Sequence, residues 1–276
     1  MTLSTAEQIA TELDRIAGAD RLLVACDFDG TLAPLADDPM AVRMHPAARA
    51  AVDELTRLPD VQVALVSGRS LVDLEIIAEH REDSPLMLAG SHGAEYWYPG
   101  EGAIEPLDAD DDTALRDRLR ATATEATAQL DGVWIEPKTF GFGVHTRRAT
   151  PADGAAANEL VDAIVREHAA HWRRRTGHNI VEYSFRHEGK DTAVASLRET
   201  VGATCVLFAG DDITDEDALR SLGPDDLGVR VGDRRTAAQL TVPDIPAFAA
   251  LLRDLARRHA ALRGAPAAES RTTAQE

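Results

Sequence analysis

Two hydrophobic patterns alternate along the chain. Short runs of small and β-branched apolar residues recur, and between them apolar residues stand three and four positions apart. The runs are typical of parallel strands covered on both faces, and the spaced positions are typical of amphipathic helices. The sequence therefore predicts an α/β fold around a parallel sheet. Strands are expected at 22–26, 61–66, 86–89, 205–209 and 227–231, and helices at 6–17, 47–58, 248–261 and shortly after 70, 190 and 214.

The pattern changes in the middle of the chain. Aromatic residues at 96–98 are followed by proline, glycines and an acidic run at 108–112, a composition that marks a domain boundary. The segment beyond it predicts an α+β cap domain inserted into the sheet-forming core. Its elements are expected as helices at 114–130 and 155–170, a hairpin at 133–136 and 142–146, and a strand at 180–185. The predicted limits are 1–100 and 189–263 for the two parts of the core, 101–188 for the cap domain and 264–276 for a flexible polar tail.

The charge of the chain limits its partners. The 276 residues, 44% of them hydrophobic, are enough for a full α/β core. A net charge of −18 and a pI near 4.9 argue against nucleic acid or an anionic membrane as partner, and no apolar run reaches membrane-spanning length. Cys26 and Cys205 lie in apolar runs, where structural thiols are expected. We therefore expect a soluble cytoplasmic protein, and a monomer is the working expectation.

The first apolar strand ends in two carboxylates. Asp27 and Asp29 are two positions apart, so both side chains could face one site, and Gly30 allows a tight turn directly after them. Ligands of open α/β sheets bind at the carboxyl ends of the strands. Two carboxylates in one site need a compensating cation, and Mg²⁺ prefers oxygen ligands. The alternative interpretation is an ordinary turn that ends the strand.

Polar residues also follow the second and third predicted strands. Ser67-Gly68-Arg69 ends the second strand, where a hydroxyl and backbone N–H groups could bind phosphoryl oxygens. Taken alone, these three residues are explained more simply by a turn. His92 follows the third strand between two glycines, although a single histidine is more often a structural residue than a ligand or base. Their position at strand ends makes these residues candidates for the same site.

Two later segments add charged candidates. Lys190 begins a predicted helix, where a cation gains nothing from the helix dipole, and this placement favours a functional role. Thr214 and Asp217 predict a capping box for the helix after the next strand. Asp211 and Asp212 precede that cap, so capping does not explain them.

The predicted hairpin of the cap domain has one polar face. Its polar residues alternate with apolar neighbours, as expected for a sheet with one face packed and one face open. A face that is simply solvated is the alternative interpretation. The polar residues are Glu136, Lys138, His145 and Arg147.

The order of these groups resembles the motifs of the haloacid dehalogenase (HAD) superfamily of phosphotransferases. The most specific is the string from Asp27 to Leu32, and the resemblance spans 22–252. Within that superfamily, the secondary motifs are similar to those of the trehalose-6-phosphate phosphatases. The chain departs from their pattern at Asp191, where glycine is common, and at 184–186, where an Arg-Pro pair is more usual. The motifs that carry the similarity are Ser91-His92-Gly93, Glu136 with Lys138, His145 and Arg147, Glu182, and the segment from Gly210 to Glu216.

The resemblance implies a HAD-like Rossmannoid parallel-sheet core with an inserted α+β cap domain, and a Mg²⁺-dependent phosphatase that forms an aspartyl-phosphate. Asp27 would be the nucleophile and Asp29 the general acid and base. The implied catalytic residues are Asp27, Asp29, Ser67 and Lys190; the implied metal-binding residues are Asp27, Asp29 through its backbone carbonyl, Asp211, Asp212 and Asp215; and the implied substrate-binding residues are Gly68, Arg69, Ser91, His92, Gly93, Glu136, Lys138, His145, Arg147 and Glu182.

The implied substrate is a small-molecule sugar phosphate, trehalose 6-phosphate, with the cap domain closing over it. Two alternatives remain open. A related phosphatase for sucrose phosphate or a glycosyl-phosphoglycerate would share the core motifs and differ only in the cap domain. A non-catalytic sugar-phosphate sensor is the more distant alternative, and Asp29 argues against it because metal binding can use the backbone carbonyl of this residue alone.

Overall fold

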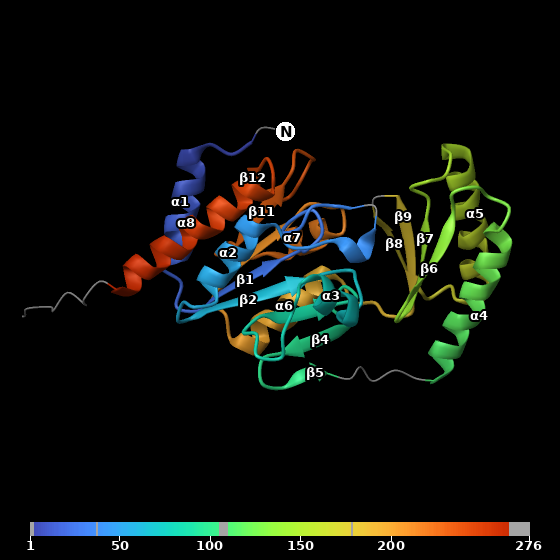
Figure 1. Ribbon diagram of the computed structural model, residues 1–276, viewed down its shortest axis with the longest axis horizontal. Coiled ribbons are helices and arrows are strands. Elements are labelled where there is room, and N and C mark those ends of the chain that lie inside the picture. The colour runs from blue at the N-terminus through green and yellow to red at the C-terminus, as the bar shows by residue number, and fades with distance from the viewer. Residues whose placement is uncertain (1–2, 37, 105–109, 178, 265–276) are drawn as a thin grey trace, which may run out of the picture.

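A large, mostly parallel sheet forms the centre of the protein. The computed structural model describes residues 3–36, 38–104, 110–177 and 179–264, and among these the sheet has eight strands in the order β12-β11-β10-β1-β2-β3-β4-β5 (Figure 1). The five strands expected from the sequence are confirmed. The parallel strands are β1 (Leu22–Cys26), β2 (Val61–Val66), β3 (Met87–Gly90), β10 (Cys205–Gly210), β11 (Leu227–Val231) and β12 (Leu240–Val242); β4 (Glu95–Tyr98) and β5 (Gly102–Ile104) pair antiparallel at one edge.

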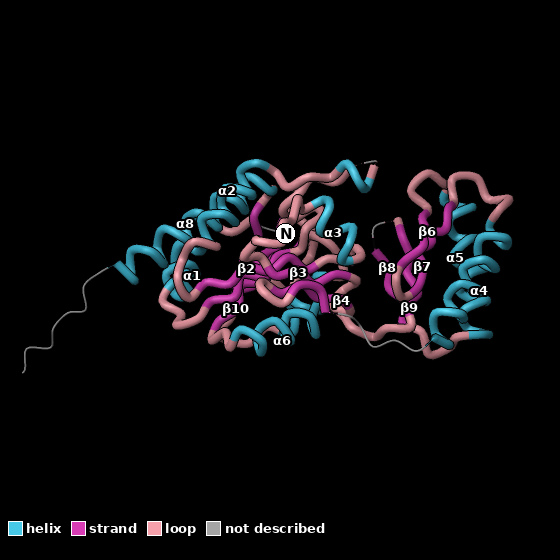
Figure 2. The backbone as a smooth tube through the Cα atoms, turned by 60° about the horizontal axis from the view of Figure 1, so that its bottom comes forward, coloured by secondary structure: helices cyan, strands magenta, loops and turns pink. Residues whose placement is uncertain are grey.

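Helices cover both faces of this sheet, which explains why β1 is buried along its whole length. Leu22, Val24 and Cys26 pack in one apolar cluster with α1, α2, α3 and α8, whereas Leu23 and Ala25 pack on the other face, with α6 and α7. Figures 1 and 2 show α6 on the opposite side of the sheet from α2 and α8. The helices are α1 (Ala6–Ala17), α2 (Pro46–Leu55), α3 (Leu71–Ile77), α6 (Lys190–Val201), α7 (Asp215–Ser221) and α8 (Ile245–Gly264), with a short 3-10 helix η1 (Pro39–Ala41) in the segment after β1. The sequence predicted that segment as irregular.

A second, antiparallel sheet is built from the middle of the chain. Its order is β6 (Trp134–Lys138), β7 (Gly141–His145), β9 (Ile180–Ser184) and β8 (Arg173–Gly177). Phe142, Val144 and Tyr183 pack against α4 (Asp110–Thr127) and α5 (Pro151–His168) on one face. The other face is turned toward the large sheet (Figure 1). Polar residues of β6, β7 and β9 therefore lie opposite the edge of the core.

The structure differs from the sequence prediction at a few elements. The sequence did not predict β8, β4, β5 or β12, and α4 begins at Asp110 rather than at 114. The division into core and cap domains stays a prediction; β5 lies beyond the predicted limit at 100 and still pairs with β4. Except for Gly264, the predicted polar tail lies outside the described residues. Within the described ranges, every helix is too short or too polar to cross a membrane.

Candidate active site

The candidate residues come together because four neighbouring strands end at the same edge of the sheet. β10, β1, β2 and β3 are parallel and adjacent. Asp211 follows β10, Asp27 follows β1, Ser67 follows β2, and His92 comes two residues after β3. These four positions all line a common cavity.

Lys190 connects the carboxylates at the bottom of this site. It is the first residue of α6 and only 3% exposed. Its Nζ donates to Asp27 Oδ1 at 2.5 Å and to Asp215 Oδ1 at 2.6 Å. Burial alone would lower the pKa of Lys190, but the two carboxylates hold it well above its ordinary value. The lysine therefore remains a cation and offsets part of the negative charge beside Asp27.

The carboxylates still carry more negative charge than one lysine balances. Burial raises the pKa of Asp27 well above its ordinary value, with Asp215 and Asp211 adding repulsion that Lys190 only partly offsets. Burial and the nearby Asp215 raise the pKa of Asp211 to about 6. Carboxylate oxygens of Asp27, Asp211 and Asp215 lie within 4.8 Å of one another. A hard divalent cation would relieve this repulsion, so the donor set fits Mg²⁺.

The hydrogen bonds indicate which oxygens could coordinate such a cation. Asp215 uses one oxygen for Lys190 and the other for the backbone N–H groups of Asp211 and Asp212, at 3.0 and 2.9 Å. Of the remaining oxygens, Asp27 Oδ2 and Asp211 Oδ1 both face the hydroxyl of Thr31 at 3.4 Å. Asp27 and Asp211 therefore fit as direct ligands, and Asp215 positions the loop that carries Asp211.

The other two predicted metal ligands direct their side chains elsewhere. Arg69 donates to both oxygens of Asp29 at 2.6 Å, which leaves the Asp29 backbone carbonyl as the group that could face a metal. Asp212 lies 3.6 Å from Arg234. Ser67 is 2% exposed, and its Oγ accepts from the N–H of Arg69 at 3.2 Å. Arg69 is therefore held at both ends, by Ser67 through its backbone N–H and by Asp29 through its guanidinium.

The turn after β3 places His92 and its neighbours differently. Ser91 and His92 both have positive φ angles, of 47° and 59°. Ser91 Oγ donates to Glu95 at 2.5 Å and borders a smaller pocket, while Gly93 packs against Ala193. His92 instead reaches across to the second sheet, where its Nε2 lies 2.9 Å from Glu182 Oε2. Of the three predicted residues, only His92 lines the main cavity.

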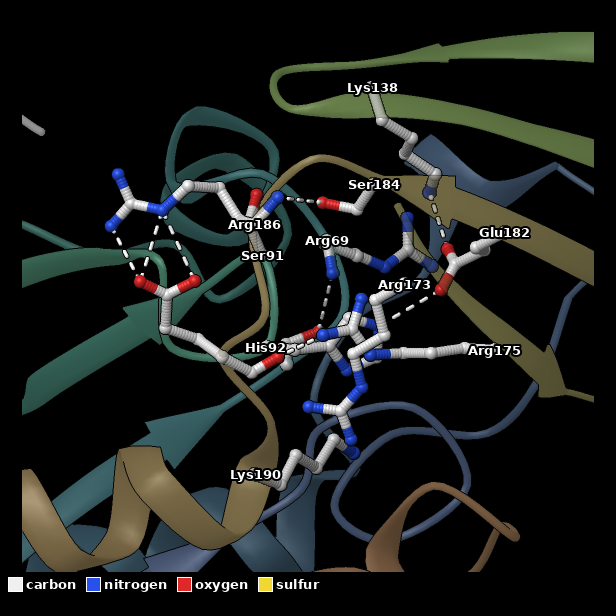
Figure 3. A network of polar contacts seen from close by, with 12 residues as sticks. Arg69, Ser91, His92, Lys138, Arg173, Arg175, Glu182, Ser184, Arg186 and Lys190 are labelled. Atoms are coloured by element: carbon white, nitrogen blue, oxygen red, sulfur yellow. Dashed lines mark hydrogen bonds and ion pairs between the residues drawn. The ribbon is translucent and has the colours of Figure 1, made fainter. Parts of the chain in front are cut away.

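The polar face of the second sheet is a connected cluster. Glu136 accepts from His145 at 2.6 Å and from Lys138 at 3.0 Å. Lys138 also lies 3.5 Å from Glu182 (Figure 3). Although burial would raise the pKa of Glu182, its bond with His92 and the charge of Lys138 hold it well below its ordinary value. Both carboxylates are thus kept ionised. The fully solvated face considered from the sequence does not describe these residues.

These groups enclose a cavity of about 540 Å³ between the two sheets. Leu35 and Met40, from the segment after β1, form an apolar wall, and Arg147 donates to the backbone carbonyl of Ala36 in that segment at 3.3 Å. The cavity combines the charged floor with the polar cluster opposite. The predicted site residues that line it are Asp27, Asp29, Ser67, Gly68, Arg69, His92, Glu136, Lys138, His145, Arg147, Glu182, Lys190, Asp211 and Asp212.

Residues 25–242 match the sequence model of a family described as trehalose-phosphatase. The chain belongs to the trehalose-phosphatase family. A trehalose-phosphate phosphatase of Mycobacterium tuberculosis (strain ATCC 25618 / H37Rv) is 34% identical over 280 residues, which cover 94% of this chain and 68% of that protein. An uncharacterized glycosyl hydrolase of M. tuberculosis (strain CDC 1551 / Oshkosh) is 33% identical over 256 residues, or 86% of this chain. This chain spans only 18% of the length of that relative.

Solved structures share the fold of this trehalose-phosphatase family member. The C-terminal domain of a trehalose-6-phosphate phosphatase from C. albicans superimposes with a TM-score of 0.79 at 22% identity, over 93% of this chain and 98% of that chain. A haloacid dehalogenase-like hydrolase from B. subtilis matches with a TM-score of 0.59 at 15% identity, over 84% of this chain and 98% of that chain. The predicted HAD-like fold is confirmed.

The sequence did not identify one buried arginine, Arg230, as a residue of the candidate site. Arg230, on β11, donates to the backbone carbonyls of Asp211 and Asp212 and lies 3.4 Å from Glu216. Its side chain is 2% exposed. The sequence signal that could have identified it was an arginine inside an apolar strand that ends beside an acidic segment. A buried cation needs partners, so this placement indicates a buried ion pair or hydrogen bonds. Arg230 fixes the loop that presents Asp211.

Two local expectations can be compared with the structure. The capping box predicted for α7 is wrong: Thr214 has helical backbone angles and makes no capping hydrogen bond, and Asp215 binds the preceding N–H groups instead.

At the departure from the family pattern, Ser184 Oγ accepts from the N–H of Arg186, which pairs with Glu188 at 2.6 Å (Figure 3). Asp191 lies in the first turn of α6.

Proposed function

We propose that this protein is a Mg²⁺-dependent phosphatase that hydrolyses trehalose 6-phosphate to trehalose and phosphate. The observation that carries the proposal is the pairing of two opposed surfaces in one cavity. Asp27, held by Lys190, forms the floor, and the Glu136–Lys138–Glu182 cluster lies opposite. The floor suits a phosphoryl group and the cluster suits sugar hydroxyls, so the cavity suits a sugar phosphate. Family membership supports the same substrate.

The proposed reaction divides hydrolysis into two steps at Asp27. In the first, an Asp27 oxygen forms a bond to phosphorus while the bond from phosphorus to the sugar oxygen breaks, and Asp29 donates a proton to that oxygen. In the second, water attacks the aspartyl-phosphate, Asp29 takes a proton from the water, and phosphate leaves with Asp27 restored. Lys190 stays beside Asp27 and offsets the charge of the phosphoryl oxygens.

Asp27 and Asp211, with the backbone carbonyl of Asp29, are the groups we propose to hold Mg²⁺. Bound there, the ion would neutralise phosphoryl charge and orient the group for in-line attack. Ser67 is placed to donate its hydroxyl proton to a phosphoryl oxygen, because its Oγ at present accepts from one N–H and is buried at the cavity floor. Gly68 and Arg69 line the same side of the cavity.

A panel of sugar phosphates tests the substrate. Phosphate release is measured with Mg²⁺ on trehalose 6-phosphate, sucrose phosphate, a glycosyl-phosphoglycerate and glucose 6-phosphate, with Asp27→Asn as the inactive control. We expect the highest kcat/KM on trehalose 6-phosphate, loss of activity in chelator, and restoration by Mg²⁺. A higher kcat/KM on another member of the panel would identify that compound as the substrate in place of trehalose 6-phosphate. Absence of turnover on every member would favour a binding protein.

Two further expectations stay proposals. A cytoplasmic location agrees with two buried cysteines that form no disulfide. A monomer is tested by light scattering during size-exclusion chromatography, where a mass near 29.7 kDa is expected.

A further inference from the structure

A second cavity, of about 250 Å³, adjoins the proposed reaction site. His92, Lys190 and Thr214 line both cavities, so these three residues form the partition between them. The second cavity is bounded on its other side by β8 and by the first turns of α7. None of the residues on that far side has a role in the reaction proposed above.

Strand β8 supplies two arginines to this cavity. Arg173 and Arg175 are two positions apart on the strand, so their side chains lie on the same face. Figure 3 shows both projecting toward the side of the site that holds His92 and Lys190. Arg174, between them, also borders the cavity, but its guanidinium is paired on the opposite face, where its Nε donates to Asp162 at 2.6 Å. The arrangement directs two guanidinium groups at one space in a chain whose net charge is −18.

In the part of the chain that the structure describes, the two arginines of this cavity are only partly paired with carboxylates. Arg175 donates to the backbone carbonyl of Glu188, and among the described residues no carboxylate lies within ion-pair distance of it. Burial, together with the charge of Arg173, lowers the pKa of Arg175 to about 10. Arg173 donates to the backbone carbonyl of His187, and the one carboxylate within ion-pair distance of it in the described part of the chain is the half-exposed Asp217, at 3.4 Å, which also pairs with the rim residue Arg220. An anion placed between the two arginines would therefore be stabilised.

We propose that this arginine-lined cavity binds inorganic phosphate as a second anion site, separate from the site where the phosphoryl group reacts. Arg175 and Arg173 would donate to the phosphate oxygens through their N–H groups, and the planar geometry of guanidinium suits such pairs. Binding itself does not depend on the proposed activity. The source of the phosphate does depend on the proposed activity. An ion released beside Lys190 would be separated from the second cavity only by the partition of His92, Lys190 and Thr214.

Calorimetric titration of the full chain with inorganic phosphate in the presence of Mg²⁺ counts the sites. We expect two binding events for the unmodified protein and one for the double variant Arg173→Gln/Arg175→Gln. Arg175→Lys keeps the positive charge but loses the planar set of guanidinium N–H donors, so it should weaken the second event by roughly tenfold or more. Arg174→Gln is the matched control, since it removes the same charge from the same strand, and should leave both events. Ser67→Ala should weaken only the other event.

Equal numbers of events and equal affinities in the unmodified protein and the double variant would overturn the proposal. A crystal of the unmodified protein soaked in selenate requires no variant: an anomalous peak between Arg173 and Arg175 is expected, and a peak beside Lys190 and Ser67 alone would also overturn it. Failure of the proposed activity would appear separately, as absence of turnover on every sugar phosphate while the two binding events persist.

Discussion

Asp29 is bound by Arg69 through both of its carboxylate oxygens. Nε and Nη2 of the arginine lie 2.6 Å from Oδ2 and Oδ1, and both side chains are largely buried. This bidentate pair holds the carboxylate beside Asp27 in a fixed orientation. It also occupies both oxygens. Protonation of Asp29 would remove the negative charge that holds this ion pair, so we expect the proposed acid and base role to loosen the contact with Arg69 during the reaction.

The substitution Asp29→Asn tests the acid and base role through the leaving group. On trehalose 6-phosphate we expect turnover to fall by roughly a hundred- to ten-thousandfold, the usual contribution of a positioned proton donor. Nitrophenolate leaves without protonation, so nitrophenyl phosphate should still form the aspartyl-phosphate. Its hydrolysis then stalls, because the variant lacks the base for the water. Stopped-flow absorbance should show a burst of about one nitrophenolate per chain. A variant that loses the same factor on both substrates and shows no burst would contradict this role.

Gly30 is required at its position for two separable reasons. Its φ is +83°, and a Cβ added to it would lie 2.3 Å from the carboxylate of Asp211. We expect Gly30→Ala to displace Asp211 and to weaken the apparent Mg²⁺ affinity by roughly ten- to a hundredfold. Gly232→Ala is the matched control: φ there is +94°, and apart from its two chain neighbours no described residue has an atom within 4 Å of the added Cβ. That variant should lose only about 1 kcal/mol of unfolding free energy. Equal Mg²⁺ affinities in the two variants would show that the contact with Asp211 is unimportant.

The core of the fold was predictable because its strands are covered on both faces. β1, β10 and β11 are uniformly buried and are encoded as apolar runs. Strand β8 was missed for the opposite reason: it lies at the edge of the smaller sheet, and its sequence, Arg-Arg-Arg-Thr-Gly, has no apolar alternation. Its conformation is set by pairing with β9, which is information that local sequence does not contain.

The candidate site was predictable where residues follow a strand end, as Asp27, Ser67 and Asp211 do. What the sequence could not supply was the partner of each side chain. Arg230 is distant in sequence from Asp211 and binds its backbone carbonyl only because β11 and β10 are neighbours. The Asp29–Arg69 pair likewise depends on β1 and β2 being adjacent and in register. Contacts of this kind follow from topology.

His92 gives the stability a predictable dependence on pH. Burial holds its pKa below the ordinary value of 6.5, although Glu182 opposes the shift. As pH falls through 6.5 the unfolded chain takes up a proton that the folded chain does not, so this contribution to stability is present at higher pH and is lost on acidification. Urea unfolding at about pH 7.5 and about pH 5.5 should therefore show a smaller loss for His92→Gln than for the unmodified protein.

The control for this measurement is the exposed His171. His171→Gln should lose as much unfolding free energy between the two pH values as the unmodified protein does. If His92→Gln also loses the same amount, then the buried His92–Glu182 contact does not contribute to the acid sensitivity, and other groups must account for it.

Substrate specificity should reside in the cluster formed by Glu136, Lys138 and Glu182. These residues lie on the smaller sheet, across the cavity from Asp27, and none of them contacts the floor carboxylates. Lys138 is held between two carboxylates, so Lys138→Ala removes a hydrogen-bond donor and leaves Glu136 and Glu182 without the shared cation. Hydrogen bonds to charged groups contribute roughly 1.5 to 3 kcal/mol. Because about 1.4 kcal/mol is tenfold in rate, Lys138→Ala and Glu136→Ala should each lower kcat/KM on trehalose 6-phosphate by roughly ten- to a hundredfold.

The same variants should hydrolyse nitrophenyl phosphate at an almost unchanged rate, because this small substrate has no sugar hydroxyls to bind the cluster. Glu159→Ala, an exposed position on α5 behind the smaller sheet, controls for loss of charge in this part of the chain and should leave both substrates unaffected. The decisive quantity is the ratio of kcat/KM values for the two substrates. If Lys138→Ala lowered both values equally, the cluster would be maintaining the fold or the floor of the site, and sugar recognition would have to lie elsewhere, with the apolar wall at Leu35 and Met40 as the next place to substitute.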